Sequence, residues 1–389
     1  MKSIGYLASA LLALSLAGCA AVEKLSGKER IEDAPPMKLG DIEQSVKVVQ
    51  KWSYSAGSTP PPGSIQLVPA IAGGVLFVAG PDGTVSAVEP DSGKSIWRTR
   101  LDHRISGAVG AGDEVVLVGT PEGVVVALDS LTGDESWTRR LSSEILAPPA
   151  AGLGISVVRT IDGHVYGLSS ENGDQQWVFH RQVPPLTLRG NSAPLIIQGL
   201  VVAGFANGKM VAADILNGTV LWDINVAEPS GRNEVERMVD IDATPVLVGS
   251  VLYVSAFQGA VTALALGSRR KLWSQDISSY TYVGADDENV YISNDEGVVL
   301  ALDRLTGNTV WEQSGLLRRK LSGPVVLGDH VLVSDFEGYV HVLRKSDGKI
   351  VGRKKLAKGG LAGTPVVYQG AIYSMNKQGS LIALTVSEG

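Results

Sequence analysis

The side chains with catalytic or metal-binding potential are few in this sequence of 389 residues, and they form no known catalytic motif. The chain has no Cys-x-x-Cys-His motif for haem, no His-x-x-x-His pair for zinc and no serine in a Gly-x-Ser-x-Gly turn. Its five histidines are scattered: His103, His164, His180, His330 and His341. We therefore expect a protein that is not an enzyme and that binds neither a cofactor nor a metal.

The single cysteine, Cys19, ends the segment LAGC after a short apolar stretch. That stretch is too short for a typical membrane-spanning helix and has the positive start of a signal peptide. The segment resembles a bacterial lipobox, which implies cleavage after residue 18 and lipidation of Cys19. Because Ala20 rather than aspartate follows, the resemblance also implies the outer membrane of a Gram-negative bacterium, with the protein facing the periplasm. An ordinary secretory signal with a chance cysteine is the alternative.

The rest of the chain divides into a linker and one long repetitive region. Residues 19–45 are polar and charged without a clear period, so we expect a flexible, lipid-anchored linker. Residues 46–386 are long for one layered domain but natural for a repeat architecture. The formal net charge of −6 and the absence of a basic stripe argue against nucleic acid as a partner.

An alternating apolar segment opened by glycine recurs eight times. The glycines are Gly83, Gly123, Gly163, Gly208, Gly259, Gly297, Gly338 and Gly379. A tryptophan stands fourteen residues after each of the first six: Trp97, Trp137, Trp177, Trp222, Trp273 and Trp311. In the seventh copy the same offset falls on Gly352, and the eighth copy ends before it.

Each copy predicts four antiparallel strands, which is one blade of a β-propeller. Alternation such as VVVAL indicates a strand, and segments such as Asp-Gly and Leu-Thr-Gly indicate tight turns. The eighth copy lacks a fourth strand, and the segment VKVVQKWSY around Trp52 can supply it. We therefore predict an all-β, eight-bladed propeller closed by an N-terminal strand that completes the last blade. The tryptophans are predicted to pack between blades; stacking of a planar cofactor is the alternative.

The repeat changes length only between a tryptophan and the next glycine. This interval is 26 residues after Trp97 and after Trp137, but 31 after Trp177 and 37 after Trp222. Both long connections flank blade four and should emerge side by side, on the face that carries the turns between second and third strands. Two adjacent long loops on a rigid scaffold favour a partner site, although surface insertions can be neutral.

The contents of the two connections support this interpretation. The first contains the apolar Leu186 and Leu188 beside Arg189, and the second ends in Asp240 and Asp242. Apolar anchors next to an arginine are typical of binding hot spots. The alternative is that the leucines pack on the blade and the aspartates cap the entry to a strand.

The blade consensus G-x-V-x-A-L-D-x-x-T-G-x-x-x-W resembles the repeats of pyrroloquinoline-quinone (PQQ) dehydrogenases. Joined to a lipobox, eight such blades resemble the BamB family of lipoproteins of the outer-membrane β-barrel assembly machinery. That resemblance implies a non-catalytic scaffold in the Bam complex, with other Bam lipoproteins and unfolded outer-membrane proteins as further partners. It also implies contact with the periplasmic POTRA domains of BamA. The matching segments LTLRG and VDID carry Leu186, Leu188, Arg189, Asp240 and Asp242 over as the contact residues.

Two other functions remain open on the sequence alone. A PQQ-dependent dehydrogenase-like enzyme would have a vicinal cysteine pair, a calcium site and an aspartate base, and this chain has only one cysteine. A generic cell-envelope propeller lipoprotein would bind a different partner. Two basic clusters, residues 316–320 and 352–356, are expected to be solvated; contact with lipid or peptidoglycan is the alternative.

Overall fold

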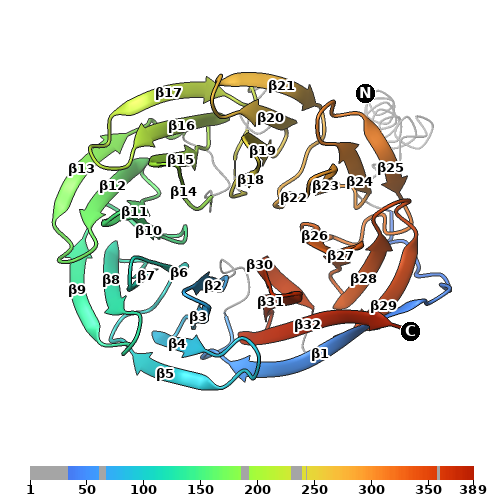
Figure 1. Ribbon diagram of the computed structural model, residues 1–389, viewed down its shortest axis with the longest axis horizontal. Helices are drawn as coiled ribbons and strands as arrows, with labels where there is room; N and C mark the ends of the chain where they lie inside the picture. Colours follow the sequence, from blue (N-terminus) through green and yellow to red (C-terminus); the bar gives the residue numbers. More distant parts are fainter. Residues whose placement is uncertain (1–33, 61–66, 185–191, 229–238, 242, 357–359) are drawn as a thin grey trace, which may run out of the picture. The chain divides into compact units, whose positions relative to one another are not determined.

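The computed structural model describes residues 34–60, 67–184, 192–228, 239–241, 243–356 and 360–389. Residues 39–389 form one compact unit, in which eight four-stranded antiparallel sheets are arranged in a ring (Figure 1). The predicted eight-bladed propeller is therefore confirmed. Within the described ranges no helix is long and apolar enough to cross a membrane.

The first four blades follow one another along the chain. Blade one consists of β2 (Ala70–Ala72), β3 (Val75–Ala79), β4 (Thr84–Val88) and β5 (Ser95–Arg100). Blade two consists of β6 (Gly107–Gly112), β7 (Val115–Gly119), β8 (Val124–Asp129) and β9 (Glu135–Arg140). Blade three consists of β10 (Ala150–Gly152), β11 (Ile155–Arg159), β12 (His164–Ser169) and β13 (Gln175–His180). Blade four consists of β14 (Leu195–Ile197), β15 (Leu200–Gly204), β16 (Lys209–Asp214) and β17 (Val220–Asn225).

The last four blades complete the ring. Blade five consists of β18 (Val246–Val248), β19 (Val251–Ser255), β20 (Val261–Ala265) and β21 (Arg270–Gln275). Blade six consists of β22 (Gly284–Ala285), β23 (Asn289–Ser293), β24 (Val299–Asp303) and β25 (Thr309–Gln313). Blade seven consists of β26 (Val325–Leu327), β27 (His330–Ser334), β28 (Tyr339–Arg344) and β29 (Ile350–Lys355). Blade eight joins β30 (Leu361–Tyr368), β31 (Ala371–Asn376) and β32 (Ser380–Glu388) to the N-terminal β1 (Val46–Ser55).

The pairing of β1 with β32 closes the ring, as the sequence predicted. Val48 lies opposite Val386 and Trp52 lies opposite Ala383 in an antiparallel register. The first and last strands of the chain therefore share one sheet, and blade eight does not end in an unpaired edge of β32.

The tryptophans pack between blades, which confirms the packing interpretation. Trp137 is buried, and its Nε1 donates a hydrogen bond of 2.9 Å to the carbonyl oxygen of Ser170 in the next blade. A small residue, Ala127, lies opposite it on β8. A Cβ atom on Gly173 would lie 2.6 Å from its ring, so this turn position must stay a glycine. The same kind of contact closes the ring, since Trp52 Nε1 donates to the carbonyl of Pro90 at 2.8 Å.

Gly352 breaks the tryptophan pattern because β1 occupies the space that an indole would fill. A Cβ atom on Gly352 would lie 2.8 Å from the carbonyl oxygen of Val46 and 2.9 Å from its Cγ2. The residue opposite Gly352 is the larger Val342 instead of the usual alanine or glycine. The seventh copy therefore differs because the N-terminal strand enters the ring beside it.

The compact unit begins before the expected boundary at residue 46. Leu39 packs on the core cluster that contains Trp311, and Gly40 accepts a hydrogen bond of 2.9 Å from Arg353 Nη1. Glu43 lies 3.2 Å from Lys349 Nζ in an ion pair. The end of the expected linker thus lies along blade seven before the chain enters β1.

Candidate partner-binding site

The described ends of the two long connections lie against each other at the base of blade four. Ser192 Oγ donates to the carbonyl of Ala243 at 3.2 Å, and the backbone N–H of Ala193 donates to Thr244 Oγ1 at 3.1 Å. These hydrogen bonds join residues 51 positions apart. The expectation that the two connections run side by side is thus confirmed at their described ends.

Both connections also lie on the predicted face of the ring. In the first connection, the backbone N–H of Arg181, after β13, donates to the carbonyl of Gly163 in the turn between β11 and β12 at 2.9 Å. The N–H of Phe257, in the turn between β19 and β20, donates to the carbonyl of Asp240 at 3.0 Å. The turns between second and third strands therefore support the connections directly.

Four of the five predicted contact residues lie outside the described residues: Leu186, Leu188, Arg189 and Asp242. The predicted lipidation site, Cys19, also lies outside them. The structure describes the ends of the two connections that contain the four contact residues. The roles of these four residues and of Cys19 stay predictions.

Asp240 is the predicted contact residue that the structure describes, and it is fully buried. Its neighbours Val239 and Ile241 are also buried and belong to the apolar cluster between blades four and five. Ile241 packs so closely on β15 that a Cβ atom on Gly204 would lie 2.5 Å from its Cγ2. In this conformation Asp240 lies in the base of the site, and its direct contact with a partner stays a prediction.

Arg159 is a residue of this site that the sequence analysis missed. It is 6 % exposed, and its Nη1 donates to the carbonyl of Ser192 at 3.4 Å. Its guanidinium lies 5.0 Å from the centre of the Phe205 ring, a favourable cation–π distance. The signal was present in the sequence, because the last position of the second strand is small or polar and uncharged in the other blades. Arg159 therefore anchors the end of the first connection to the neighbouring blade.

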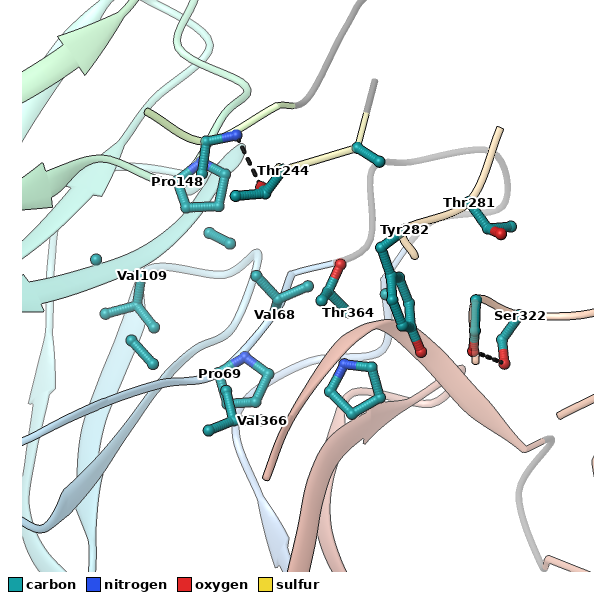
Figure 2. Close-up of a pocket in the computed structure, with 18 of the residues that line it drawn as sticks. Val68, Pro69, Val109, Pro148, Thr244, Thr281, Tyr282, Ser322, Thr364 and Val366 are labelled. Atoms are coloured by element: carbon teal, nitrogen blue, oxygen red, sulfur yellow. Dashed lines mark hydrogen bonds between the residues drawn. The ribbon is translucent and has the colours of Figure 1, made fainter. Parts of the chain in front are cut away.

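The first strands of the blades surround a central cavity of about 1130 Å³. Figure 2 shows Val68, Pro69, Val109 and Pro148 on its wall, with Thr244 beside them. The wall is mainly apolar, and burial raises the pKa of the Tyr282 hydroxyl far above its ordinary value, so the phenol stays neutral. In the described part of the chain, no group of three or more His, Cys, Asp or Glu side chains is placed to hold a metal ion.

Comparison with known proteins identifies the family. The family model described as "Outer membrane protein assembly factor BamB" matches residues 81–313 and 295–389. A protein of that description from Pseudomonas aeruginosa is 47 % identical, over 97 % of this chain and 98 % of its own length. The chain belongs to the BamB family. A BamB-family protein from Legionella pneumophila is 40 % identical over 95 % of this chain and 96 % of its own length.

Solved structures separate the family from its distant fold relatives. The crystal structure of BamB from Moraxella catarrhalis is 28 % identical, has a TM-score of 0.77 and covers 86 % of this chain and 100 % of its own. The quinohemoprotein alcohol dehydrogenase of Comamonas testosteroni is only 12 % identical, with a TM-score of 0.67 over 87 % of this chain and 76 % of its own. The dehydrogenases thus share the fold alone. The BamB relatives are named as assembly factors, which supports the prediction that this chain is not an enzyme.

One residue of the basic cluster at residues 316–320 of this BamB-family chain is not solvated, contrary to expectation, whereas Lys320 is exposed. Arg319 is 3 % exposed, and its Nε donates to Asp335 Oδ2 at 2.8 Å; it also pairs with Glu337. Both carboxylates follow Arg319 by sixteen or more residues in the chain, so the cluster by itself does not reveal them. The turn between β27 and β28 brings them back to Arg319.

The second basic cluster contributes to the same network. Arg353 Nε donates to His341 Nδ1 at 3.2 Å, and His341 Nε2 lies 3.0 Å from Asp335 Oδ2. Burial would raise the pKa of Asp335, but hydrogen bonds from His341 and Arg319 outweigh it and hold that pKa below its ordinary value. Lys355 remains exposed at the end of β29.

Proposed function

We propose that this chain is a non-catalytic scaffold in the assembly of outer-membrane β-barrel proteins, and that it binds the POTRA domains of BamA. The observation that carries the proposal is the pair of connections around blade four, joined at their ends by the Ser192–Ala243 and Ala193–Thr244 hydrogen bonds. Two long segments held together on a rigid ring make a platform, and such loops carry binding more often than the scaffold does.

The residues of the two connections take different roles in this proposal. Leu186 and Leu188 are the apolar anchors, and the guanidinium N–H groups of Arg189 donate hydrogen bonds to a carboxylate or to backbone carbonyls of the partner. Asp242 is the acidic contact of the second connection. The buried Asp240 positions that connection through its backbone bond to Phe257.

The family and the sequence together support an outer-membrane location. We propose that Cys19 is lipidated and holds the propeller on the periplasmic side, in company with the other Bam lipoproteins. Acyl chains contribute about 0.8 kcal/mol per buried CH₂ group, so several chains on one cysteine hold a soluble domain firmly.

The substitution Arg189→Glu tests the binding site. Reversing the charge at a hot spot of an interface should reduce co-purification with BamA at least about tenfold. The midpoint of thermal unfolding should stay unchanged, because Arg189 lies in an insertion between two copies of the repeat. The matched control is Arg270→Glu, at an exposed position on β21, which should leave co-purification intact. Retained binding in the Arg189→Glu variant would contradict the assignment.

A further inference from the structure

Positive charge is concentrated on one half of the rim of the propeller. The outer strands β29, β1, β5 and β9 are neighbours along that rim (Figure 1). They contain nine cationic residues, which we call the basic arc: Lys47, Lys51, Arg98, Arg100, Arg139, Arg140, Arg353, Lys354 and Lys355. Glu135 is the acidic residue on these four strands. The residues of these four strands thus carry an excess of eight positive charges, in a chain whose formal net charge is −6.

The opposite half of the rim has no such excess. The outer strands of blades three to six, β13, β17, β21 and β25, contain two cations, Arg270 and Lys271. They also contain two acidic residues, Asp223 and Glu312. Charges on edge strands commonly prevent aggregation, but that role would apply equally to all eight outer strands. It does not explain why the cations lie on four consecutive ones.

Several cations of the arc are held in place by neutral partners. Arg98 Nη1 donates to the carbonyl of Ser55 at 3.1 Å, and Lys354 Nζ donates to the carbonyl of Val48 at 3.0 Å. A carbonyl fixes the position of a cation without cancelling its charge. These bonds link the outer strands of blades one and seven to β1, so the arc is a continuous and ordered surface.

Carboxylates offset only part of the positive charge. Arg100 pairs with Asp82 at 2.6 Å but its side chain is 65 % exposed, and Arg139 lies 4.0 Å from Asp174. Exposed pairs of this kind are weak and leave the guanidinium available to another anion. Lys47 and Lys51, at the centre of the arc, are exposed.

The N-terminal chain enters the propeller at the centre of this arc. Residues 39–45 lie along blade seven, where Gly40 bonds Arg353, and the chain then becomes β1. A segment from Cys19 to residue 38 spans at most about 70 Å when fully extended. This step rests on the proposed lipidation of Cys19: a membrane that holds Cys19 stays within reach of the arc, which raises the effective concentration of lipid there.

We propose that the basic arc binds the surface of a membrane through its anionic phospholipid headgroups. Each cation near an anionic membrane strengthens binding by about fivefold, and these factors multiply over several such residues. In this contact the outer strands of blades seven, eight, one and two would face the lipid. The connections around blade four lie across the ring and stay available, so the inference is separate from the proposed BamA site.

Vesicle sedimentation tests the inference. The probe is a chain of residues 20–389, which retains the compact unit 39–389 and has no acyl chain. We expect it to pellet with vesicles of phosphatidylethanolamine and phosphatidylglycerol (3:1) at low salt, and not with vesicles of phosphatidylcholine. Raising the salt to about 0.5 M should release it, because ions screen charge at surfaces.

Charge reversal locates the contact. Lys47→Glu/Lys51→Glu should lower partition onto the anionic vesicles at least about tenfold. The matched control, Arg269→Glu/Arg270→Glu, makes the same change in net charge at exposed positions on blade five and should bind like wild type. Thermal melts establish that both variants are folded, and both should still co-purify with BamA. No pelleting of wild type, equal pelleting with phosphatidylcholine, or equal loss in both variants would overturn the inference.

Discussion

His341 is fully buried between charged side chains, and only its neutral form fits this network. Its Nδ1 accepts the hydrogen bond from Arg353, so that nitrogen carries no proton, and Nε2–H can donate to Asp335. Burial lowers the pKa of His341, although the neighbouring Asp335 opposes that shift. The residue therefore remains neutral in the folded protein under conditions in which the unfolded chain already binds a proton.

This difference predicts a pH dependence of stability. A histidine whose pKa is depressed on folding contributes stability above its unfolded pKa, near 6.5, and that stability is lost as the pH falls below this value. The free energy of unfolding of wild type should thus decrease between pH 7 and pH 5 more steeply than that of His341→Gln. Urea titrations at several pH values measure both slopes, and the four other histidines cancel in the comparison. Equal slopes would mean that His341 does not titrate on unfolding.

At the scale of single elements, β1 determines where the repeat must depart from its consensus. Six copies place a tryptophan at a position where the seventh has Gly352, and the structure shows Val46 in close contact there. A repeat unit can be predicted from its own sequence. The exception at Gly352 could not be predicted in this way, because it is caused by contact with β1, which lies about 300 residues earlier in the chain.

Restoring the consensus at Gly352 should therefore destabilise the protein. Gly352→Trp and Gly352→Ala both add a Cβ atom that would lie 2.8 Å from the carbonyl oxygen of Val46. Overpacking of this kind lowers the free energy of unfolding by about 1–3 kcal/mol. The control is Gly267→Ala, since a Cβ atom there meets no atom within 4 Å. Chemical unfolding measures the difference, and a Gly352→Trp variant as stable as wild type would show that β1 does not fill this space.

At the scale of the whole molecule, the fixed spacing of fourteen residues between glycine and tryptophan predicted the eight-bladed ring. The remaining tryptophan, Trp52, predicted that an N-terminal strand completes the last blade. The repeat predicted much less about the candidate site. Leu186 and Arg189 lie in an insertion, where no period constrains the chain, and Asp240 proved to be buried in the base of the site. The pairing of Arg319 with Asp335 and Arg159 with Ser192 also depends on how the turns meet in space.

The central claim is that the connections around blade four face BamA, and cross-linking in native envelopes tests it most directly. A photoreactive residue in place of Leu188 should form an adduct with BamA after irradiation. The control is the same residue in place of Leu131, which is 77 % exposed in the turn between β8 and β9. That turn joins third and fourth strands and lies on the other face of the ring. An adduct with BamA from position 188 and none from position 131 is the predicted result; no adduct from position 188, or equal adducts from both, would contradict the account.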